Sequence, residues 1–125
     1  MVDDEPVVLR SGERLLKRMG FSVLKAKDGQ ESVDIFNQTE EAITCVILDL
    51  TMPGMGGGVT MAELKKVRPD VPIILSSGYS EEHIAEAPRQ LAPAAFLPKP
   101  YDFDKLNRVL RKVLSTRGKR DSEAS

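Results

Sequence analysis

Hydrophobic positions along this chain follow two alternating periods, one typical of helices and the other of buried strands. From Pro6 onward, apolar residues recur every three or four positions until Gly20, which predicts a helix that begins at a proline and ends at a glycine. The same spacing returns around Val33 and Phe36, from 61 to 67, and from Leu106 to Leu114, where the amphipathic stripe is cleanest. Residues 80–86 form a weaker, polar helix candidate.

Short apolar runs lie between these helices and predict strands at residues 21–26, 45–48, 71–75 and 94–97. The run Cys45-Val46-Ile47-Leu48 is apolar at every position, as expected for a parallel strand that is covered on both faces. Because strand and helix alternate throughout, we expect an α/β fold with a parallel sheet and right-handed crossovers. One domain should span residues 1–116, followed by a polar, frayed tail at 117–125.

Composition narrows the class of protein. The 125 residues suit one domain with a real core, and 41% hydrophobic with 30% charged residues is ordinary for a soluble, folded chain. A net charge of −1 provides no overall field for nucleic acid or an anionic membrane. No apolar run approaches the roughly 20 residues that span a bilayer, and the acidic start is not a signal peptide. The single Cys45 excludes an internal disulfide, so we expect a cytoplasmic location.

The side chains that carry chemistry lie where the predicted strands end. Asp3 and Asp4 precede the first helix, Asp49 ends the most apolar strand, Ser76 and Ser77 end the next, and Lys99 ends the last. The carboxyl ends of parallel strands share one edge, where such folds place their sites. Clustered carboxylates repel unless a cation neutralises them, and Mg²⁺ prefers oxygen ligands of this kind. With a lysine to balance an anion and a hydroxyl to position it, the set suits phosphoryl transfer to an aspartate.

Four segments resemble the successive motifs of response-regulator receiver domains, in the right order and over the chain to about Leu114. They are Val2-Asp3-Asp4-Glu5-Pro6, Ile47 to Met55, Leu75-Ser76-Ser77-Gly78 and Phe96-Leu97-Pro98-Lys99-Pro100. The resemblance implies a flavodoxin-like, doubly wound domain whose five parallel strands lie in the order 2-1-3-4-5.

The resemblance also implies a role for each matching residue. Asp49 is the expected phospho-acceptor, and Asp3, Asp4, Asp49 and the backbone carbonyl of Thr51 are the expected Mg²⁺ ligands. Ser77 and Lys99 are expected to contact the phosphoryl group, and Phe96 to change rotamer on activation. Pro53 and Pro100 are expected to be structural, with a cis Lys99–Pro100 bond.

These roles imply a signalling switch that catalyses its own phosphorylation and dephosphorylation, not an enzyme with an external substrate. The implied donor is a phosphohistidine on a sensor histidine kinase or a phosphotransfer protein. The implied output surface surrounds the fourth helix, fifth strand and fifth helix, coupled through Ser77 and Phe96. We expect a monomer or weak dimer without direct nucleic-acid binding. The motif Ser77-Gly78-Tyr79-Ser80 resembles the receiver of a hybrid histidine kinase, and a single-domain regulator is the alternative parent.

Rival functions match only parts of the sequence. A phosphatase with an aspartate nucleophile requires a second aspartate two residues on, where Thr51 stands. A dinucleotide-binding domain requires Gly-x-Gly-x-x-Gly, but Val59 occupies the third glycine's place after Gly54-Met55-Gly56. A degenerate receiver that only binds proteins is disfavoured by the intact acid, hydroxyl and lysine set.

Three features depart from the family pattern or leave an alternative open. Phe96 lacks the hydroxyl of the commoner tyrosine, and Gly56-Gly57-Gly58 predicts an unusually flexible loop after the acceptor. Asp4 or Glu5 is also a candidate N-cap for the first helix.

The first strand is the largest departure, since only Met1 and Val2 precede the acid pair. Losing about four apolar side chains at roughly 1.5–3 kcal/mol each removes about 6–12 kcal/mol, comparable to the roughly 5–15 kcal/mol that stabilises a domain. We therefore expect an apolar strand upstream in the natural protein. In the structure we expect a stub at Val2 between strands carrying Val23 and Ile47, with a gap or another segment above it.

Overall fold

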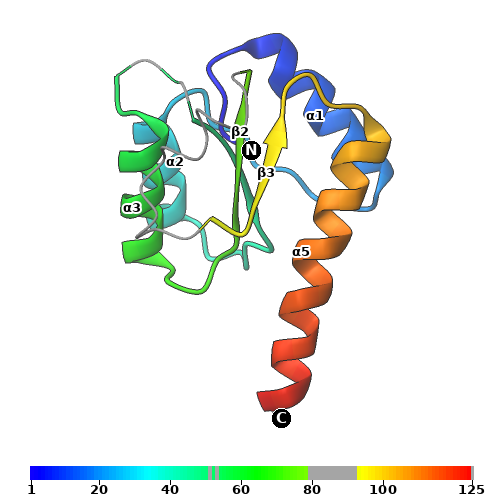
Figure 1. Ribbon diagram of the computed structural model, residues 1–125. Helices are drawn as coiled ribbons and strands as arrows, with labels where there is room; N and C mark the ends of the chain where they lie inside the picture. Colours follow the sequence, from blue (N-terminus) through cyan, green and yellow to red (C-terminus); the bar gives the residue numbers. More distant parts are fainter. Residues whose placement is uncertain (51, 53, 79–92, 125) are drawn as a thin grey trace.

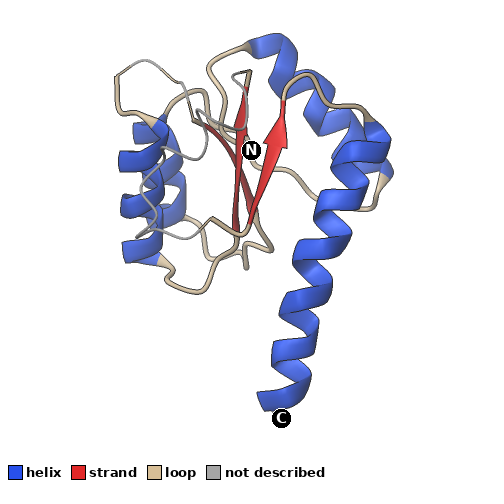
Figure 2. Cartoon of the chain, in the orientation of Figure 1, coloured by secondary structure: helices blue, strands red, loops and turns tan. Residues whose placement is uncertain are grey.

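Three parallel strands form the centre of the computed structural model, which describes residues 1–50, 52, 54–78 and 93–124. They are β1 (Val46–Asp49), β2 (Ile73–Ser77) and β3 (Ala95–Pro98), in the order β1-β2-β3. Figures 1 and 2 show helices on both sides of this sheet, with α2 (Gly29–Gln38) and α3 (Gly57–Val67) on one side, and α1 (Pro6–Arg18) and α5 (Phe103–Ala124) on the other. This arrangement confirms the predicted α/β fold.

Local sequence accounts for where the helices begin. Pro6 occupies the first turn of α1, where its missing N–H has no helical partner to lose. The Asp28 side chain caps α2 by accepting a hydrogen bond from the Glu31 N–H at 2.8 Å. Asp102 accepts from the Lys105 N–H at 2.9 Å at the start of α5. Past the end of α1, Gly20 has a φ of 95°, a left-handed conformation that favours glycine.

The apolar runs form two clusters, one on each face of the sheet. Leu48, Ile73 and Leu75 point toward α2 and α3, where they pack with Phe36, Met61 and Leu64. Ile47, Ile74 and Leu97 point the other way and pack with Leu16, Leu106 and Leu110. Because successive side chains of a strand point to opposite faces, a run that is apolar at every position serves both clusters.

The strand predicted at residues 21–26 does not form as a strand, and the expected count of five strands is not reached in the described residues. Only Ala26 pairs, through an isolated parallel bridge with Val2, and Val2 forms a second parallel bridge with Leu48. A strand requires a paired neighbour along its length, and the hydrogen bond from the Met1 amine to the Leu24 carbonyl, at 2.8 Å, adds to this bridge without completing a strand. The lateral order is nevertheless the predicted one, because Ala26, Val2, β1, β2 and β3 follow one another as positions 2-1-3-4-5.

Two further differences concern segments that the sequence described as flexible. Gly57 and Gly58 belong to the first turn of α3, and a Cβ on Gly57 would lie 2.5 Å from the Leu50 Cα, so close backbone approach explains this glycine. The last helix continues to Ala124 instead of fraying after Ser115. Lysine, arginine and glutamate are good helix formers, which favours this continuation. The Lys99–Pro100 bond is cis, the isomer that the resemblance implied.

Candidate functional site

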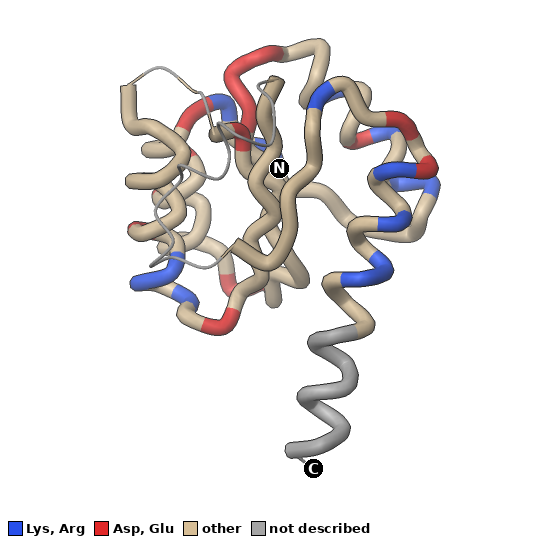
Figure 3. The backbone as a smooth tube through the Cα atoms, in the orientation of Figure 1, with Lys and Arg blue, Asp and Glu red and all other residues tan. Residues whose placement is uncertain are grey.

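Three carboxylates meet at the carboxyl edge of the sheet, meaning the end at which β1, β2 and β3 finish. Asp49 is the last residue of β1, and Asp3 follows the Val2 stub directly; both are only 2% exposed. Asp4 is exposed beside them, and Figure 3 shows the acidic stretch ahead of α1 at this edge. One carboxylate oxygen from each of Asp3, Asp4 and Asp49 lies within 4.8 Å of the others.

Lys99 provides the positive charge at this group. It follows β3, and its Nζ lies 2.7 Å from an Asp3 oxygen and 3.4 Å from an Asp49 oxygen. A third carboxylate, Glu5, is more distant at 3.9 Å and largely exposed. Because the Lys99 side chain is only 15% exposed and both nearer partners are buried, the charges of this ion pair are poorly screened by water.

Backbone hydrogen bonds between neighbouring strand ends position these side chains. The Asp49 N–H donates to the Val2 carbonyl at 2.9 Å, so β1 holds the stub that carries the acid pair. The Lys99 N–H donates to the Ser77 carbonyl at 2.8 Å, which places the lysine beside the end of β2. The site therefore depends on main-chain pairing along one edge, from Val2 to Lys99.

Neither Asp4 nor Glu5, the two N-cap candidates from the sequence, caps α1 with its side chain. Glu5 occupies the N-cap position but makes no side-chain capping hydrogen bond. Instead, the Glu5 N–H donates to an Asp3 oxygen at 3.0 Å, which fixes the Asp3 side chain between this N–H and Lys99. Asp3 is thereby oriented toward the lysine, and Asp4 is not used as a cap.

The pKa values of Asp4 and Lys99 are both raised, which disfavours the charged form of Asp4 and favours the charged form of Lys99. Burial raises the pKa of Asp4, and the neighbouring Asp49 and Asp3 raise it further against one backbone hydrogen bond. Burial alone would lower the pKa of Lys99, but its hydrogen bond to Asp3 and the charges of Asp49 and Asp3 outweigh burial and raise it. The lysine thus stays protonated, while the three carboxylates still repel one another.

Both serines at the end of β2 are buried. Ser76 is 2% exposed and pairs with Asp49 across the sheet, and its Oγ has no hydrogen-bond partner in the described part of the chain. Ser77 is fully buried at 0% and pairs with Pro98. Phe96, the expected switch aromatic, is 40% exposed on β3. Thr51 and Pro53 lie outside the described residues, as do Tyr79, Ser80 and the helix candidate at 80–86.

Tyr101 is a neighbour of the site that sequence reasoning missed. Its hydroxyl is buried without a hydrogen-bond partner among the described residues. Burial raises its pKa, and the charges of Asp3 and Asp49 raise it further, so the phenol stays protonated beside the acid group. Its position two residues after Lys99 is the only sequence signal that could have indicated it.

The donor set fits a hard divalent cation. Three carboxylate oxygens within 4.8 Å of one another provide oxygen ligands and an excess of negative charge that Lys99 only partly balances. Mg²⁺ is commonly held by one or two carboxylates and completes its shell with water, for which the exposed side of Asp4 leaves room.

Comparison with known proteins agrees with this geometry. The family described as response regulator receiver domain matches residues 1–111. The sensor kinase CckA of Brucella abortus is 33% identical over 91% of the chain, and the transcriptional regulatory protein GlrR of Escherichia coli is 34% identical over 91%. The chain spans only 12% and 25% of the lengths of these two relatives.

Solved structures show the same fold. A CheY-like response regulator receiver domain from Methanospirillum hungatei superposes with a TM-score of 0.85 at 23% identity, covering 95% of this chain and 94% of that one. A receiver domain from Clostridium thermocellum gives 0.83 at 26% identity, covering 94% and 93%. The chain belongs to the response-regulator receiver domain family of two-component signal transduction. In the described part of the chain, no helix has the length and apolarity to cross a membrane.

Proposed function

We propose that this receiver domain accepts a phosphoryl group on Asp49, in a reaction that depends on Mg²⁺ held by Asp3, Asp4 and Asp49. The observation that carries the proposal is the cluster of three carboxylates within 4.8 Å with Lys99 at 2.7 Å and 3.4 Å from two of them. Asp49 alone of the three ends a strand of the sheet, where pairing with Val2 and Ser76 holds its backbone at the carboxyl edge.

The chemistry is a displacement at phosphorus. A carboxylate oxygen of Asp49 attacks the phosphorus of a phosphohistidine, the P–N bond breaks, and the imidazole nitrogen keeps the electron pair and takes up a proton. The bound cation would neutralise charge on the phosphoryl oxygens. Lys99, already 3.4 Å from Asp49, contacts the new anion, and the Ser77 hydroxyl donates a hydrogen bond to it. Water later hydrolyses the acyl phosphate and restores the carboxylate with release of inorganic phosphate.

The class of protein indicates the phosphoryl donor, and the arrangement of the sheet indicates which surface changes on phosphorylation. The donor is a phosphohistidine on a sensor histidine kinase or a phosphotransfer protein. The output surface includes β3 and α5, because Lys99 directly follows β3 and the half-exposed Phe96 lies within it. A movement of Lys99 toward a phosphoryl group therefore acts directly on the strand that presents Phe96. Hybrid-kinase parentage, which the motif at Ser77 implied, stays a prediction.

Incubation with acetyl phosphate and Mg²⁺, followed by intact-mass measurement, tests the proposal. We expect labelling of the wild-type domain that is lost without Mg²⁺ and abolished in Asp49→Asn. Asp34→Asn is the matched control, because it makes the same chemical change at an exposed position on α2. An unlabelled wild-type domain would favour the degenerate, protein-binding receiver. Acid-stable labelling of Asp49→Asn would refute the assignment of the acceptor.

A further inference from the structure

Two buried hydroxyl groups near the carboxyl edge have no hydrogen-bond partner in the part of the chain that the structure describes. One belongs to Ser76, in β2, and the other to Tyr101, which lies between β3 and α5. Buried hydroxyls are usually paired, because burial removes their hydrogen bonds to water and costs free energy where no protein group replaces them. An unpaired buried hydroxyl therefore calls for a partner that the resting structure does not provide.

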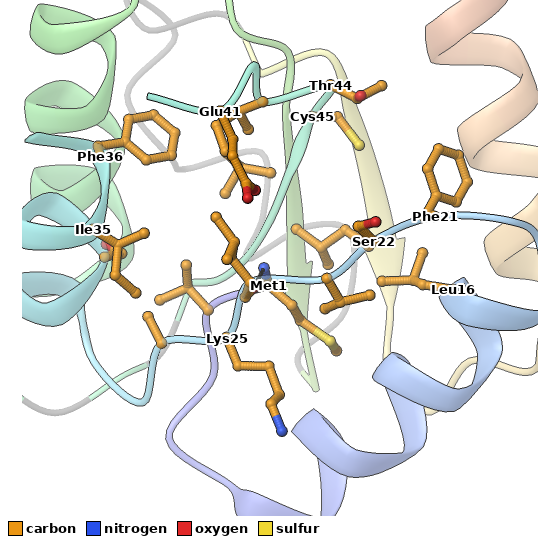
Figure 4. Close-up of a pocket in the computed structure, with 18 of the residues that line it drawn as sticks. Met1, Leu16, Phe21, Ser22, Lys25, Ile35, Phe36, Glu41, Thr44 and Cys45 are labelled. Carbon is orange, nitrogen blue, oxygen red and sulfur yellow. Dashed lines mark hydrogen bonds between the residues drawn. The ribbon is translucent and has the colours of Figure 1, made fainter. Parts of the chain in front are cut away.

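Both hydroxyl groups belong to the face of the sheet that α1 and α5 cover. Figure 4 shows the two faces at the other end of the sheet, with Phe36 of α2 on one side and Leu16 of α1 on the other. Leu75 packs in the cluster beneath α2 and α3, so Ser76, the next residue of β2, points to the opposite face. Tyr101 packs against the α1–α5 cluster itself.

Asp3 lies on this face as well, beside Tyr101. It follows Val2, which packs beneath α2 and α3, so the Asp3 side chain points toward α1 and α5. A Cβ on Gly12 would lie 3.6 Å from the Tyr101 hydroxyl oxygen, which places this hydroxyl against α1, the helix that begins just after the acid pair. Burial and then the charges of Asp3 and Asp49 raise the pKa of Tyr101, so the hydroxyl keeps its proton as a donor.

In the resting state, Asp3 receives two donors and Tyr101 has no acceptor among the described residues. One Asp3 oxygen accepts from the Glu5 N–H at 3.0 Å, and the other lies 2.7 Å from the Lys99 Nζ. The same Nζ lies farther from Asp49, at 3.4 Å. In the proposed function this lysine contacts a phosphoryl group carried by Asp49, so it turns away from Asp3 when that group arrives.

The turn of Lys99 would leave the Asp3 carboxylate short of a donor. Asp3 is only 2% exposed, so water is poorly placed to replace the lysine. Removing one partner of a buried charge is strongly unfavourable, because the charge then lacks both water and a counterion. A carboxylate offers about four acceptor sites, so Asp3 has room for a hydroxyl beside the Glu5 N–H and a cation. The buried, unpaired donor on its face of the sheet is Tyr101.

We propose that Tyr101 is a positioning residue for the phosphorylated state, in which its hydroxyl donates a hydrogen bond to Asp3 as Lys99 turns to the phosphoryl group. This inference rests on the proposed phosphorylation of Asp49. No covalent bond changes and no proton is transferred, since the hydrogen bonds only exchange partners. Tyr101 thereby keeps Asp3 oriented and makes the movement of Lys99 less costly. Because α5 begins at Phe103, the exchange also links the acid group to the start of that helix.

Tyr101→Phe tests the proposal, because it removes the hydroxyl and keeps the ring. Ser76→Ala is the matched control, since it removes the other unpaired hydroxyl on the same face. In the resting, metal-free domain, thermal melts of Tyr101→Phe should show a midpoint equal to or above that of the wild type, because an unpaired buried hydroxyl does not stabilise the fold.

The phosphorylated state is probed with Mg²⁺ and beryllofluoride, an anion that binds a carboxylate oxygen with the tetrahedral geometry of a phosphoryl group. Calorimetric titration should show that Tyr101→Phe binds beryllofluoride about fivefold more weakly than the wild type, the size of one hydrogen bond, while Ser76→Ala binds it normally. The NMR signal of the Tyr101 Cζ, assigned by its loss in Tyr101→Phe, should shift when beryllofluoride is added to the wild type.

Three results would overturn the proposal. Unchanged beryllofluoride affinity in Tyr101→Phe would show a hydroxyl without a role in this state. An equal loss in Ser76→Ala would show a general effect of the buried face, and a lower melting midpoint of resting Tyr101→Phe would show a hydroxyl that is already paired. If the wild-type domain binds no beryllofluoride and takes no label, the proposed function fails together with this inference. Normal wild-type labelling with an unaffected Tyr101→Phe variant refutes this inference alone.

Discussion

The two ends of the central sheet differ sharply in how completely they are built. At the carboxyl edge, Asp3, Asp49 and Lys99 are buried and in contact, with Nζ–oxygen distances of 2.7 Å and 3.4 Å. At the opposite end, about 400 Å³ of cavity lies where the same stub would continue as a strand. Both ends share Val2, which pairs on one side with Ala26 and on the other with Leu48.

The comparison shows that the site needs less of the first strand than the hydrophobic core does. The acid pair needs its backbone held at one point, and the hydrogen bonds of Val2 and Asp3 to the neighbouring segments provide this. The core needs apolar volume along the whole strand, which one residue cannot provide. We therefore expect site chemistry to survive in this chain at a cost in overall stability.

The largest expected effect comes from filling this cavity with residues joined to the chain ahead of Met1. An extension of four apolar residues ahead of Met1 should raise the free energy of unfolding by up to about 6–12 kcal/mol, from roughly 1.5–3 kcal/mol for each buried side chain. Urea melts should show a higher midpoint and a steeper slope, because more surface is exposed on unfolding. An extension of four serines is the control. Equal midpoints and slopes for the two extensions would show that the central strand is dispensable.

Asp4→Asn should separate function from stability at the carboxyl edge. Mg²⁺ affinity should fall by at least about tenfold, or about 1.4 kcal/mol, and phosphorylation should slow in parallel. The raised pKa of Asp4 means that the folded state disfavours its charge, so stability falls as pH rises above the unfolded pKa. Removing that charge should slightly stabilise the metal-free domain at pH 7, as thermal melts would show. Unchanged Mg²⁺ dependence would contradict the role of the acid pair.

Ser77→Ala should have a smaller effect, which weakens the conformational change after phosphorylation and leaves phosphorylation itself intact. In the proposed reaction the hydroxyl contacts only the phosphorylated product, so labelling by acetyl phosphate should persist while the conformational change that follows is blunted. Amide hydrogen exchange across β3 and α5 before and after labelling measures that change. Ser76→Ala is the matched control, because Ser76 is equally buried and pairs with Asp49. A normal response in Ser77→Ala with a blunted one in Ser76→Ala would transfer the role to Ser76.

The smallest effect is a pH dependence at the cavity end. Burial lowers the pKa of the Met1 amine to about 6 from a usual value of 8.0. The folded state then binds fewer protons than the unfolded state between these values, so stability should rise as pH increases from 6 to 8. Comparison of thermal melts for the free and N-acetylated chains isolates this contribution. Equal pH profiles would place the amine in solvent.

Sequence and structure agree best where local signals are strong. Pro6, Asp28 and Gly20 delimit helices by rules that act within a few residues, and the structure follows them. The apolar run at Val46 to Leu48 predicted a central strand because every side chain there had to be buried. The expected stub at Val2 and the gap beyond it are also confirmed.

Agreement fails where an element depends on its neighbour. Residues 21–26 have the composition of a strand, but their pairing with the Val2 segment is limited to the bridge at Ala26 and a hydrogen bond from the Met1 amine to the Leu24 carbonyl. The run Gly56-Gly57-Gly58 predicts a flexible loop, but Gly57 is constrained by the Leu50 backbone, whose Cα lies 2.5 Å from the position that a Cβ on Gly57 would occupy. The local sequence predicts neither the unformed strand at residues 21–26 nor the close packing at Gly57, because both depend on contacts with another segment of the chain.

By itself the sequence determined the order of strand ends and therefore which side chains reach the carboxyl edge: Asp3, Asp4, Asp49, Ser77 and Lys99 follow from alternation and spacing. Only the tertiary structure decided which of these side chains contact one another and at what distance. Lys99 lies closer to Asp3 than to Asp49, Asp3 is fixed by the Glu5 N–H, and Tyr101 is buried beside them. The two distances from Lys99 differ by less than one ångström, and the packing that brings Lys99 to Asp3 and Asp49 from a remote part of the chain sets that difference.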